Sequence, residues 1–308
     1  MLSNKNILFY ANDAGGGNIL IPIIKKLEVK NKIFLYPTGP TKKLWENQSF
    51  LYSISKTNNL DSIDLIITGT SHFSNTERNI WLKCKQEKKL CIAILDSWIN
   101  IEDRFKDTKN NGYIFPNEIY VLTNGCKKKI LNLNPNLKVM IIENPLMNYF
   151  NKTKKNNYLK DKSIIYFCSS KNNLDLDTQF KIIEKIKNIS LSKHKFLIKP
   201  HPSDTVNDWK KRFPTNLTNI SNVLLFENSI LSISSNSFSL IDSVLAGVPS
   251  LNIITNNSNY NFYKDYKKYI KSLNLETFLS LNSIDIFMKQ PKKFSRKNKN
   301  NWEDCLKI

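Results

Sequence analysis

Short apolar runs alternate with amphipathic segments along the chain. In the first half, each run is four or five residues long and apolar at almost every position, which is typical of strands buried on both faces of a parallel sheet. These runs cover residues 7–11, 33–36, 65–68, 91–95, 119–122 and 139–142. Between the first two, apolar residues at helical spacing predict a helix over 18–30, with Pro22 in its first turn. The pattern predicts an α/β fold.

A second series of the same kind follows a polar, Lys- and Asn-rich segment at 148–162, which has the composition of a linker. Its predicted strands cover 164–168, 196–199, 223–226, 231–234 and 251–254. The last fifty residues favour helices, give no strand signal and contain a basic stretch at 289–301. We therefore expect two Rossmann-like domains, residues 1–150 and 160–308, that face each other across a cleft.

Composition supports a folded protein in a reducing compartment. The 308 residues are 41% hydrophobic, and the five cysteines are scattered without a Cys-x-x-Cys pair. This spacing disfavours both a disulfide framework and a structural zinc site. No run has the length of a signal peptide or a membrane span. These features predict a cytoplasmic protein.

The charge is strongly positive, because 46 Lys and Arg residues stand against 26 Asp and Glu residues, a net charge of +20. Nucleic acid, an anionic membrane surface or a phosphate-rich substrate would each be attracted. The excess is mostly lysine in a chain also rich in Asn and Ile, so compositional drift remains an alternative. The basic stretch at 289–301 predicts peripheral attachment to an anionic membrane face.

Three glycines follow the first predicted strand, in the segment Asn12, Asp13, Ala14, Gly15, Gly16, Gly17, Asn18. Glycines at a strand-to-helix turn let a ligand approach the backbone, and the helix amino terminus attracts anions. The alternative is that the glycines only make a tight turn. The spacing matches neither the Gly-x-Gly-x-x-Gly fingerprint nor the P-loop motif. This disfavours a dinucleotide cofactor and a P-loop phosphate site.

His201 stands between Pro200 and Pro202, directly after a predicted strand. The two prolines restrict the backbone and fix where the imidazole points, which favours a ligand contact over a structural role. Ser169, Ser170 and Lys171 follow the first strand of the second half, and Lys171 would supply a cation to a phosphate.

A serine-rich cluster precedes a predicted helix in the second half. Its members are Ser234, Ser235, Asn236 and Ser237. Such a cluster is either a plain helix cap or a phosphate cradle made of hydroxyls, backbone N–H groups and the helix dipole. Its position after a strand, in the same half as His201, favours the cradle.

Further polar residues follow strands in the first half. Thr70, Ser71 and Glu77 come after one strand, and Asp96 and Trp98 come after the next. Asp96 is either a functional carboxylate or the cap of a turn. Trp98 either contacts a ligand or belongs to the core. Asp175 and Asp177 precede a helix and are expected to cap it rather than to bind a metal ion.

Three of these blocks together resemble GT-B-fold glycosyltransferases of bacterial surface-polysaccharide synthesis. The blocks are NDAGGGN, KPHPSD and SSNSFSLIDSVLAGVPSLNI, in that order across both halves. They are similar to the His-Pro-motif enzymes of the sialyltransferase and Kdo-transferase type and, more distantly, to UDP-N-acetylglucosamine 2-epimerases. The resemblance implies that the glycine block faces the acceptor and that His201, Ser235, Asn236 and Ser237 hold the donor phosphates. Asp242 stands where many relatives carry a Glu on the donor ribose, which leaves the nucleotide open.

The sequence thus predicts a metal-independent glycosyltransferase without a cofactor. It would move a sugar from a nucleotide-sugar donor, bound by the second domain, to a surface-glycan or lipid-linked acceptor. Asp13 is the expected general base, with Glu77 and Asp96 as rivals. A 2-epimerase and a teichoic-acid-type phosphoalcohol transferase are alternatives. A nucleic-acid-binding protein is a further one, disfavoured because its only Lys-interleaved aromatic stretch, 259–271, has the pattern of an amphipathic helix.

Overall fold

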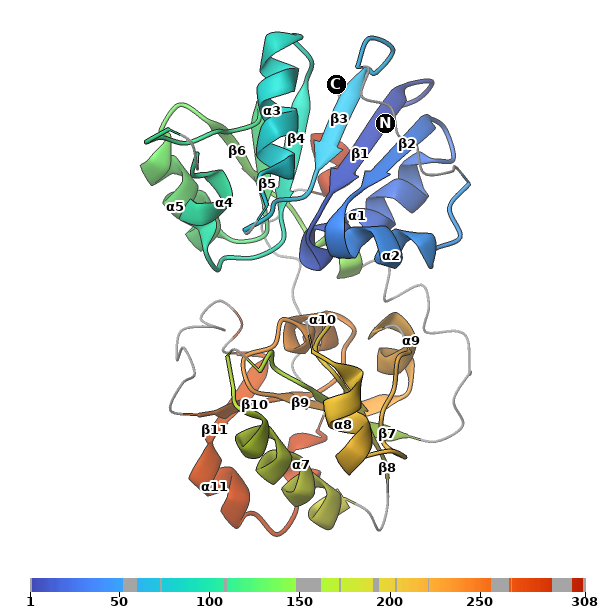
Figure 1. The fold of residues 1–308 in the computed structure, drawn as a ribbon, viewed down its shortest axis with the longest axis vertical. Helices are drawn as coiled ribbons and strands as arrows, with labels where there is room; N and C mark the ends of the chain where they lie inside the picture. Colours follow the sequence, from blue (N-terminus) through green and yellow to red (C-terminus); the bar gives the residue numbers. More distant parts are fainter. Residues whose placement is uncertain are drawn as a thin grey trace. The chain divides into compact units, whose positions relative to one another are not determined.

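The chain folds into two compact units (Figure 1). The computed structural model describes residues 2–51, 60–72, 74–107, 110–147, 162–171, 173–190, 194–202, 204–220, 222–255, 266, 268–289 and 301–306. The first unit comprises Met1–Leu146 and the carboxyl-terminal segment Arg296–Ile308, and the second comprises Met147–Ser295. The expected linker and most of the basic stretch at 289–301 lie outside the described residues, as does most of the aromatic stretch at 259–271.

The first unit is built on a six-stranded parallel sheet in the order β2-β1-β3-β4-β5-β6. Each strand lies within one residue of its predicted bounds: β1 (Asn6–Ala11), β2 (Lys32–Pro37), β3 (Leu65–Thr68), β4 (Cys91–Leu95), β5 (Glu118–Val121) and β6 (Lys138–Ile141). The helices of this unit are α1 (Ala14–Leu27), α2 (Gly39–Glu46), α3 (Thr76–Gln86), α4 (Ile101–Phe105), α5 (Asn124–Leu133) and α12 (Trp302–Cys305). A core containing Trp81 and Phe105 joins α3, α4 and α5 to one face of the sheet.

The carboxyl-terminal helix α12 belongs to the first unit, whereas the sequence placed the whole of 160–308 in the second domain. Its Trp302 is buried, and the hydroxyl of Tyr120 on β5 donates a hydrogen bond to the Cys305 carbonyl oxygen at 2.9 Å. Glu303 forms an ion pair of 3.6 Å with Lys26 on α1. These contacts link the chain end to the first unit.

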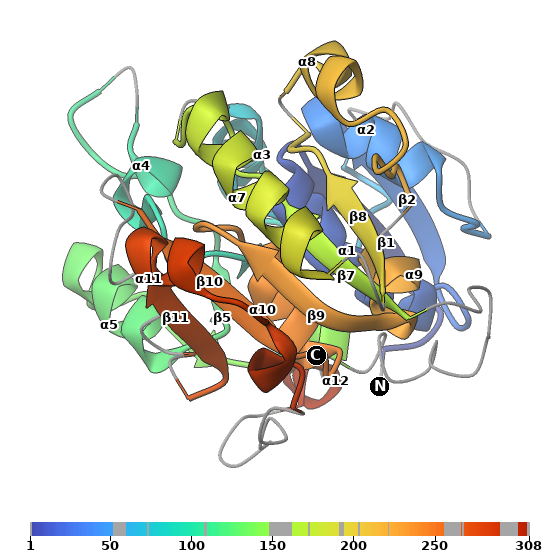
Figure 2. The same ribbon diagram turned by 90° about the horizontal axis from the view of Figure 1, so that it is seen from below.

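The second unit is built on a five-stranded parallel sheet in the order β11-β10-β9-β7-β8. Its strands are β7 (Ser163–Phe167), β8 (Lys195–Lys199), β9 (Ser229–Ser234), β10 (Ser250–Ile254) and β11 (Ile270–Asn274). Its helices are α7 (Leu176–Ser190), α8 (Val206–Arg212), α9 (Asn222–Glu227), α10 (Ser239–Leu245) and α11 (Leu275–Ser280), followed by a 3-10 turn, η2 (Asp285–Phe287). Figure 2 shows α7 and α11 over one face of this sheet, where both contribute to a single apolar core.

Three element predictions are wrong. The run at 223–226 forms helix α9, with Leu225 buried and Leu224 exposed, because four apolar residues suit either a strand or one helical face. Strand β11 was not expected, since only Ile270 of its residues is buried. Helix α1 begins at Ala14 rather than residue 18, so the glycines lie inside its first turn.

Both sheets have the same reversal of strand order. β1 lies between β2 and β3, and β7 lies between β8 and β9, so successive chain connections leave in opposite directions at these points. In open parallel sheets, ligands bind beside the carboxyl ends of the strands at such a reversal. The segments after β1 and β3, and those after β7 and β9, are therefore the places to look for a site. Among the described helices, none is long and apolar enough to cross a bilayer.

Candidate functional site

Asp13 connects the ends of β1 and β3 in the first unit. Its carboxylate accepts hydrogen bonds from the Asn12 side-chain amide at 2.9 Å and from the backbone N–H of His72 at 3.1 Å. Asp13 is the N-cap residue of α1 by backbone geometry, yet its side chain makes no capping hydrogen bond. The carboxylate thus lies at the reversal point of the sheet, partly exposed, and is not an Asx-turn on its own loop.

Glu77, on the first turn of α3, is buried with 1% of its surface exposed. One carboxylate oxygen accepts from the Asn12 backbone N–H at 2.8 Å and from the Ser71 hydroxyl at 2.7 Å, and the other accepts from Thr76 at 2.8 Å. Burial raises the pKa of this carboxyl, and the hydrogen bonds oppose the shift. Glu77 therefore ties β1, the segment after β3 and α3 together, and it has almost no surface to offer a substrate.

Asp96 follows β4 and is held by a buried arginine. Arg104 donates to Asp96 Oδ1 at 3.0 Å and to the Thr70 carbonyl and hydroxyl oxygens at 2.9 and 2.8 Å. The second oxygen, Oδ2, lies against Gly15 in the first turn of α1. Arg104 was not singled out from the sequence, because an arginine in the polar run IEDRF gives no sign of burial.

Each glycine of α1 makes room for a neighbour. A β-carbon on Gly16 would lie 3.2 Å from the Gly69 α-carbon, and one on Gly17 would lie 2.5 Å from the Thr41 hydroxyl. Gly16 and Gly17 are buried, Asn18 is half-buried, and only Gly15 is exposed. None of the three has a positive φ. Close packing of α1 on its own unit therefore accounts for Gly16 and Gly17.

In the second unit, the segments after β7 and β8 meet beside His201. The Asp204 backbone N–H donates to the His201 carbonyl oxygen at 2.9 Å, and Asp204 Oδ1 accepts from the Lys171 backbone N–H at 3.3 Å. His201 is half-buried, and burial lowers its pKa while the Asp204 charge opposes the shift. Burial thus favours the uncharged form of the imidazole, which lies close to a loop that carries the exposed Lys171.

Ser169 links the segment after β7 to the segment after β9. Its hydroxyl donates to the Ser235 carbonyl oxygen, and its backbone N–H donates to Gln179 Oε1 at 3.0 Å. The Gln179 amide donates back to the Ser169 carbonyl oxygen at 3.1 Å. Ser170 is also buried. Gln179 is buried on α7 and is a positioning residue that the sequence did not reveal.

The four members of the serine-rich cluster separate into two pairs. Ser234 donates its hydroxyl proton to the Phe167 carbonyl oxygen at 2.6 Å, and Ser235 donates to the Ile253 carbonyl oxygen at 2.7 Å. Both are buried, so in this conformation their hydroxyl protons hold β9 to its two neighbours. Asn236 and Ser237 are half-buried and reach the surface.

Asn236 has a left-handed backbone, with φ of 62°. Its N–H donates to Asn252 Oδ1 at 3.2 Å, while its own Oδ1 is buried and has no hydrogen-bond partner among the described residues. The Ser237 hydroxyl accepts from the Ser239 N–H at 3.2 Å. Asp242 is half-buried one turn further along α10. An unpaired buried acceptor such as Asn236 Oδ1 costs free energy. A ligand that donates a hydrogen bond to this oxygen would recover that free energy.

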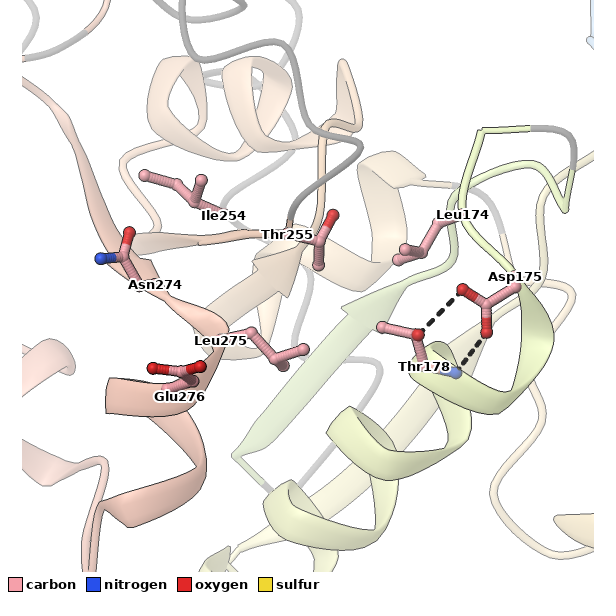
Figure 3. A pocket seen from close by; sticks show the side chains of 8 residues that line it. All are labelled: Leu174, Asp175, Thr178, Ile254, Thr255, Asn274, Leu275 and Glu276. Carbon is pink, nitrogen blue, oxygen red and sulfur yellow. Dashed lines mark hydrogen bonds between the residues drawn. The ribbon is translucent and has the colours of Figure 1, made fainter.

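A pocket of about 550 Å³ lies at the carboxyl ends of β10 and β11 in the same unit (Figure 3). It is lined by Leu174, Asp175, Thr178, Ile254, Thr255, Asn274, Leu275 and Glu276. These residues come from three distant parts of the chain, so no sequence signal identifies the pocket. Asp175 caps α7 as expected, because its two oxygens accept from the Thr178 N–H and hydroxyl, each at 2.8 Å.

Trp98 and the cysteines also have defined surroundings. Trp98 is partly buried and packs against the core of the first unit. All five cysteines are free, and four of them are buried. The described residues contain no group of three or more His, Cys, Asp or Glu side chains arranged to hold a metal ion.

No family model matches the chain, and no curated protein matches it in sequence. Solved structures do match. MnaA from S. aureus, solved with UDP, has a TM-score of 0.64 at 11% identity and covers 89% of this chain and 86% of its own. UDP-GlcNAc 2-epimerase from Methanocaldococcus jannaschii gives 0.62 at 14% identity over 96% and 95% of the two chains. The glycosyltransferase of kitacinnamycin gives 0.54 at 9% identity over 94% and 93%. The predicted α/β, GT-B-like fold class is thus confirmed.

Proposed function

We propose that this chain is an enzyme acting on nucleotide sugars, and that it transfers the sugar to a surface-glycan or lipid-linked acceptor. The observation that carries the proposal is the grouping of His201, Lys171 and Asn236 around the carboxyl ends of β7, β8 and β9 in the second unit. Similarity to MnaA, whose structure contains UDP, supports a uridine nucleotide. A uridine nucleotide would also bring a diphosphate that suits a cationic chain.

The donor diphosphate would be bound by three kinds of group. The neutral His201 imidazole donates one N–H, Lys171 supplies a positive charge, and the segment of Ser235, Asn236 and Ser237 supplies polar groups beside α10. Because the buried Ser234 and Ser235 hydroxyl protons are already donated, we assign the direct contacts to Asn236 and Ser237. These groups would stabilise the charge that develops on the leaving phosphate without a divalent ion.

In the first unit, we propose Asp13 as the general base that accepts the proton of the acceptor hydroxyl. Asp13 is partly exposed at the strand reversal, whereas Glu77 is buried and accepts three internal hydrogen bonds. Asp96 remains the rival, since its Oδ2 reaches the same helix turn. Lipid-linked acceptors lie at membrane surfaces, and the net charge of +20 would favour peripheral attachment there.

Sugar-nucleotide 2-epimerisation is the second candidate. The 2-epimerase from Methanocaldococcus jannaschii and the UDP-bound MnaA both match this fold with higher TM-scores than the glycosyltransferase of kitacinnamycin. The two reactions differ in whether they need an acceptor. Incubation with UDP-GlcNAc alone, followed by proton NMR of the anomeric region, distinguishes them. Accumulation of the C2 epimer without an acceptor would assign the epimerase activity.

A nucleotide screen tests the proposal itself. Thermal unfolding is measured with UDP-, GDP-, CDP- and CMP-sugars, alongside filter binding of DNA and RNA across a salt series. Specific binding of one nucleotide at about 100 times its Kd would stabilise the fold by about 2.7 kcal/mol. Stabilisation by one nucleotide supports the enzyme. If no nucleotide stabilises the protein and nucleic acid binds with a steep salt dependence, the chain is a nucleic-acid-binding protein.

A further inference from the structure

Two hydrogen-bonded links connect the pocket at the ends of β10 and β11 to the proposed phosphate site in the second unit. On one side, the Gln179 amide that holds Ser169 also donates to the carbonyl oxygen of Leu174, a lining residue, at 2.9 Å. On the other side, the Ser235 hydroxyl donates to the Ile253 carbonyl oxygen, and the next residue, Ile254, lines the pocket. A group attached to the donor phosphate would therefore have this pocket as its neighbour.

The charge of the pocket is opposite to that of the chain. Asp175 and Glu276 line it, and none of its eight described lining residues is basic, although the chain carries 46 Lys and Arg residues. Both acidic residues are exposed. The Thr178 N–H and hydroxyl lower the pKa of Asp175, so this carboxylate remains ionised through the physiological range. The pocket therefore presents two negative charges to its occupant.

The remaining lining suits a sugar ring. Figure 3 shows Leu174 and Thr178 on the α7 side, and Thr255 and Leu275 on the strand side, directed toward the space between them. Apolar side chains can cover the C–H face of a ring, while carboxylate, amide and hydroxyl oxygens accept its O–H groups. The volume of about 550 Å³ lies within the range of small-molecule sites.

We infer that this pocket holds the sugar of the donor and that it restricts the donor to sugars without a carboxylate group. The inference rests on the proposed function and specifies its substrate class. A uronate or another acidic sugar would bring a like charge beside Asp175 and Glu276 and would lose binding free energy. Donors of sialic acid and Kdo, which carry a carboxylate, are excluded on the same ground.

A matched ligand pair tests this inference. UDP-glucose and UDP-glucuronate differ only in oxidation of C6, and UDP alone measures the nucleotide contribution. By calorimetry at low ionic strength, we expect the wild-type Kd for UDP-glucuronate to be at least about tenfold higher than for UDP-glucose, a difference of about 1.4 kcal/mol. The double variant Asp175→Asn/Glu276→Gln should reduce that ratio to below about threefold and leave UDP binding unchanged.

The control is Glu184→Gln, which removes a negative charge on α7 that does not line the pocket. It should keep the wild-type ratio. If UDP binds and the two UDP-sugars bind equally to the wild type, or if the ratio persists in the double variant, the inference is wrong while the proposed function stands. If neither UDP nor either UDP-sugar binds, the uridine donor of the proposed function is wrong, and the inference, which rests on that donor, falls with it.

Discussion

The Asp96 carboxylate occupies the space that a side chain on Gly15 would need. A β-carbon built on Gly15 would overlap Asp96 Oδ2, while Arg104 holds Oδ1 of the same carboxylate at 3.0 Å. The carboxylate is thus fixed between a buried arginine and the first turn of α1. Close packing against Asp96 therefore accounts for a glycine at this exposed position.

Gly15→Ala should destabilise the protein by about 1–3 kcal/mol, because overpacking against an anchored group outweighs the gain in helix propensity. Gly112→Ala is the control, since nothing lies within 4 Å of a β-carbon there. In a double-mutant cycle measured by urea unfolding, Asp96→Ala should relieve at least about 1 kcal/mol of the Gly15→Ala cost. Strictly additive costs would show that the two residues do not compete for space.

Glu77→Ala should lower the free energy of unfolding by roughly 2–4 kcal/mol, because it leaves the Asn12 N–H and the Ser71 hydroxyl without their buried acceptor. Glu87→Ala, at the end of the same helix, removes only a surface ion pair of 3.6 Å with Lys83 and should cost less than about 0.5 kcal/mol. Urea unfolding of both variants measures the difference. Equal small costs would contradict the structural role of Glu77.

Asp13→Asn should lower kcat by about 10²- to 10⁴-fold, because an amide cannot accept the acceptor proton. The amide oxygen can still accept from the His72 N–H, so donor binding and the nucleotide-induced thermal shift should be normal. Single-turnover rates measure the loss of catalysis, and thermal shifts measure donor binding. A variant that keeps more than about a tenth of the rate would reassign the base, with Asp96→Asn and then Glu77→Gln as the next measurements.

His201→Ala should weaken donor binding while leaving the melting temperature nearly unchanged, because the residue is only half-buried and follows β8 beside the segment of Lys171. Calorimetric titration with the nucleotide sugar and thermal unfolding of the same sample measure the two effects. Unchanged donor affinity together with a loss of several kcal/mol in stability would make His201 a structural residue.

The pH dependence of stability follows from the same imidazole. Burial lowers the pKa of His201 below its ordinary value of 6.5, so the unfolded chain takes up a proton at a pH where the folded protein does not. Its contribution to stability is therefore complete above about pH 6.5 and is lost as the pH falls below that value. Urea unfolding at about pH 7.5 and 5.5 should show a smaller loss for His201→Gln than for the wild type. The same loss in both would contradict burial as the cause.

The strands were predictable because parallel strands buried on both faces leave continuous apolar runs, as at 91–95, where the prediction and β4 agree. The same rule fails where that condition fails. β11 has polar residues at an edge of the sheet, and the run at 223–226 is too short to distinguish a strand from a helix. Local pattern therefore identifies central strands better than edges or short helices.

The sequence predicted those candidate site residues that directly follow a strand. Motifs such as the one around His201 stand directly after a strand, so the topology brings them to one edge. The sequence does not show that the Ser234 and Ser235 hydroxyls are used between strands, or that Gly16 is needed to pack on Gly69. These facts depend on contacts between residues that are far apart in the chain.

The contact between Tyr120 and Cys305 reverses the order in which the two units can be completed during synthesis. The two residues are 185 positions apart, although both belong to the first unit. At ribosomal rates of about 5–20 residues per second, roughly 10–40 s separate their emergence. The first unit therefore cannot be completed until α12 has been synthesised. The second unit, Met147–Ser295, is continuous, so it can close earlier although it is made later.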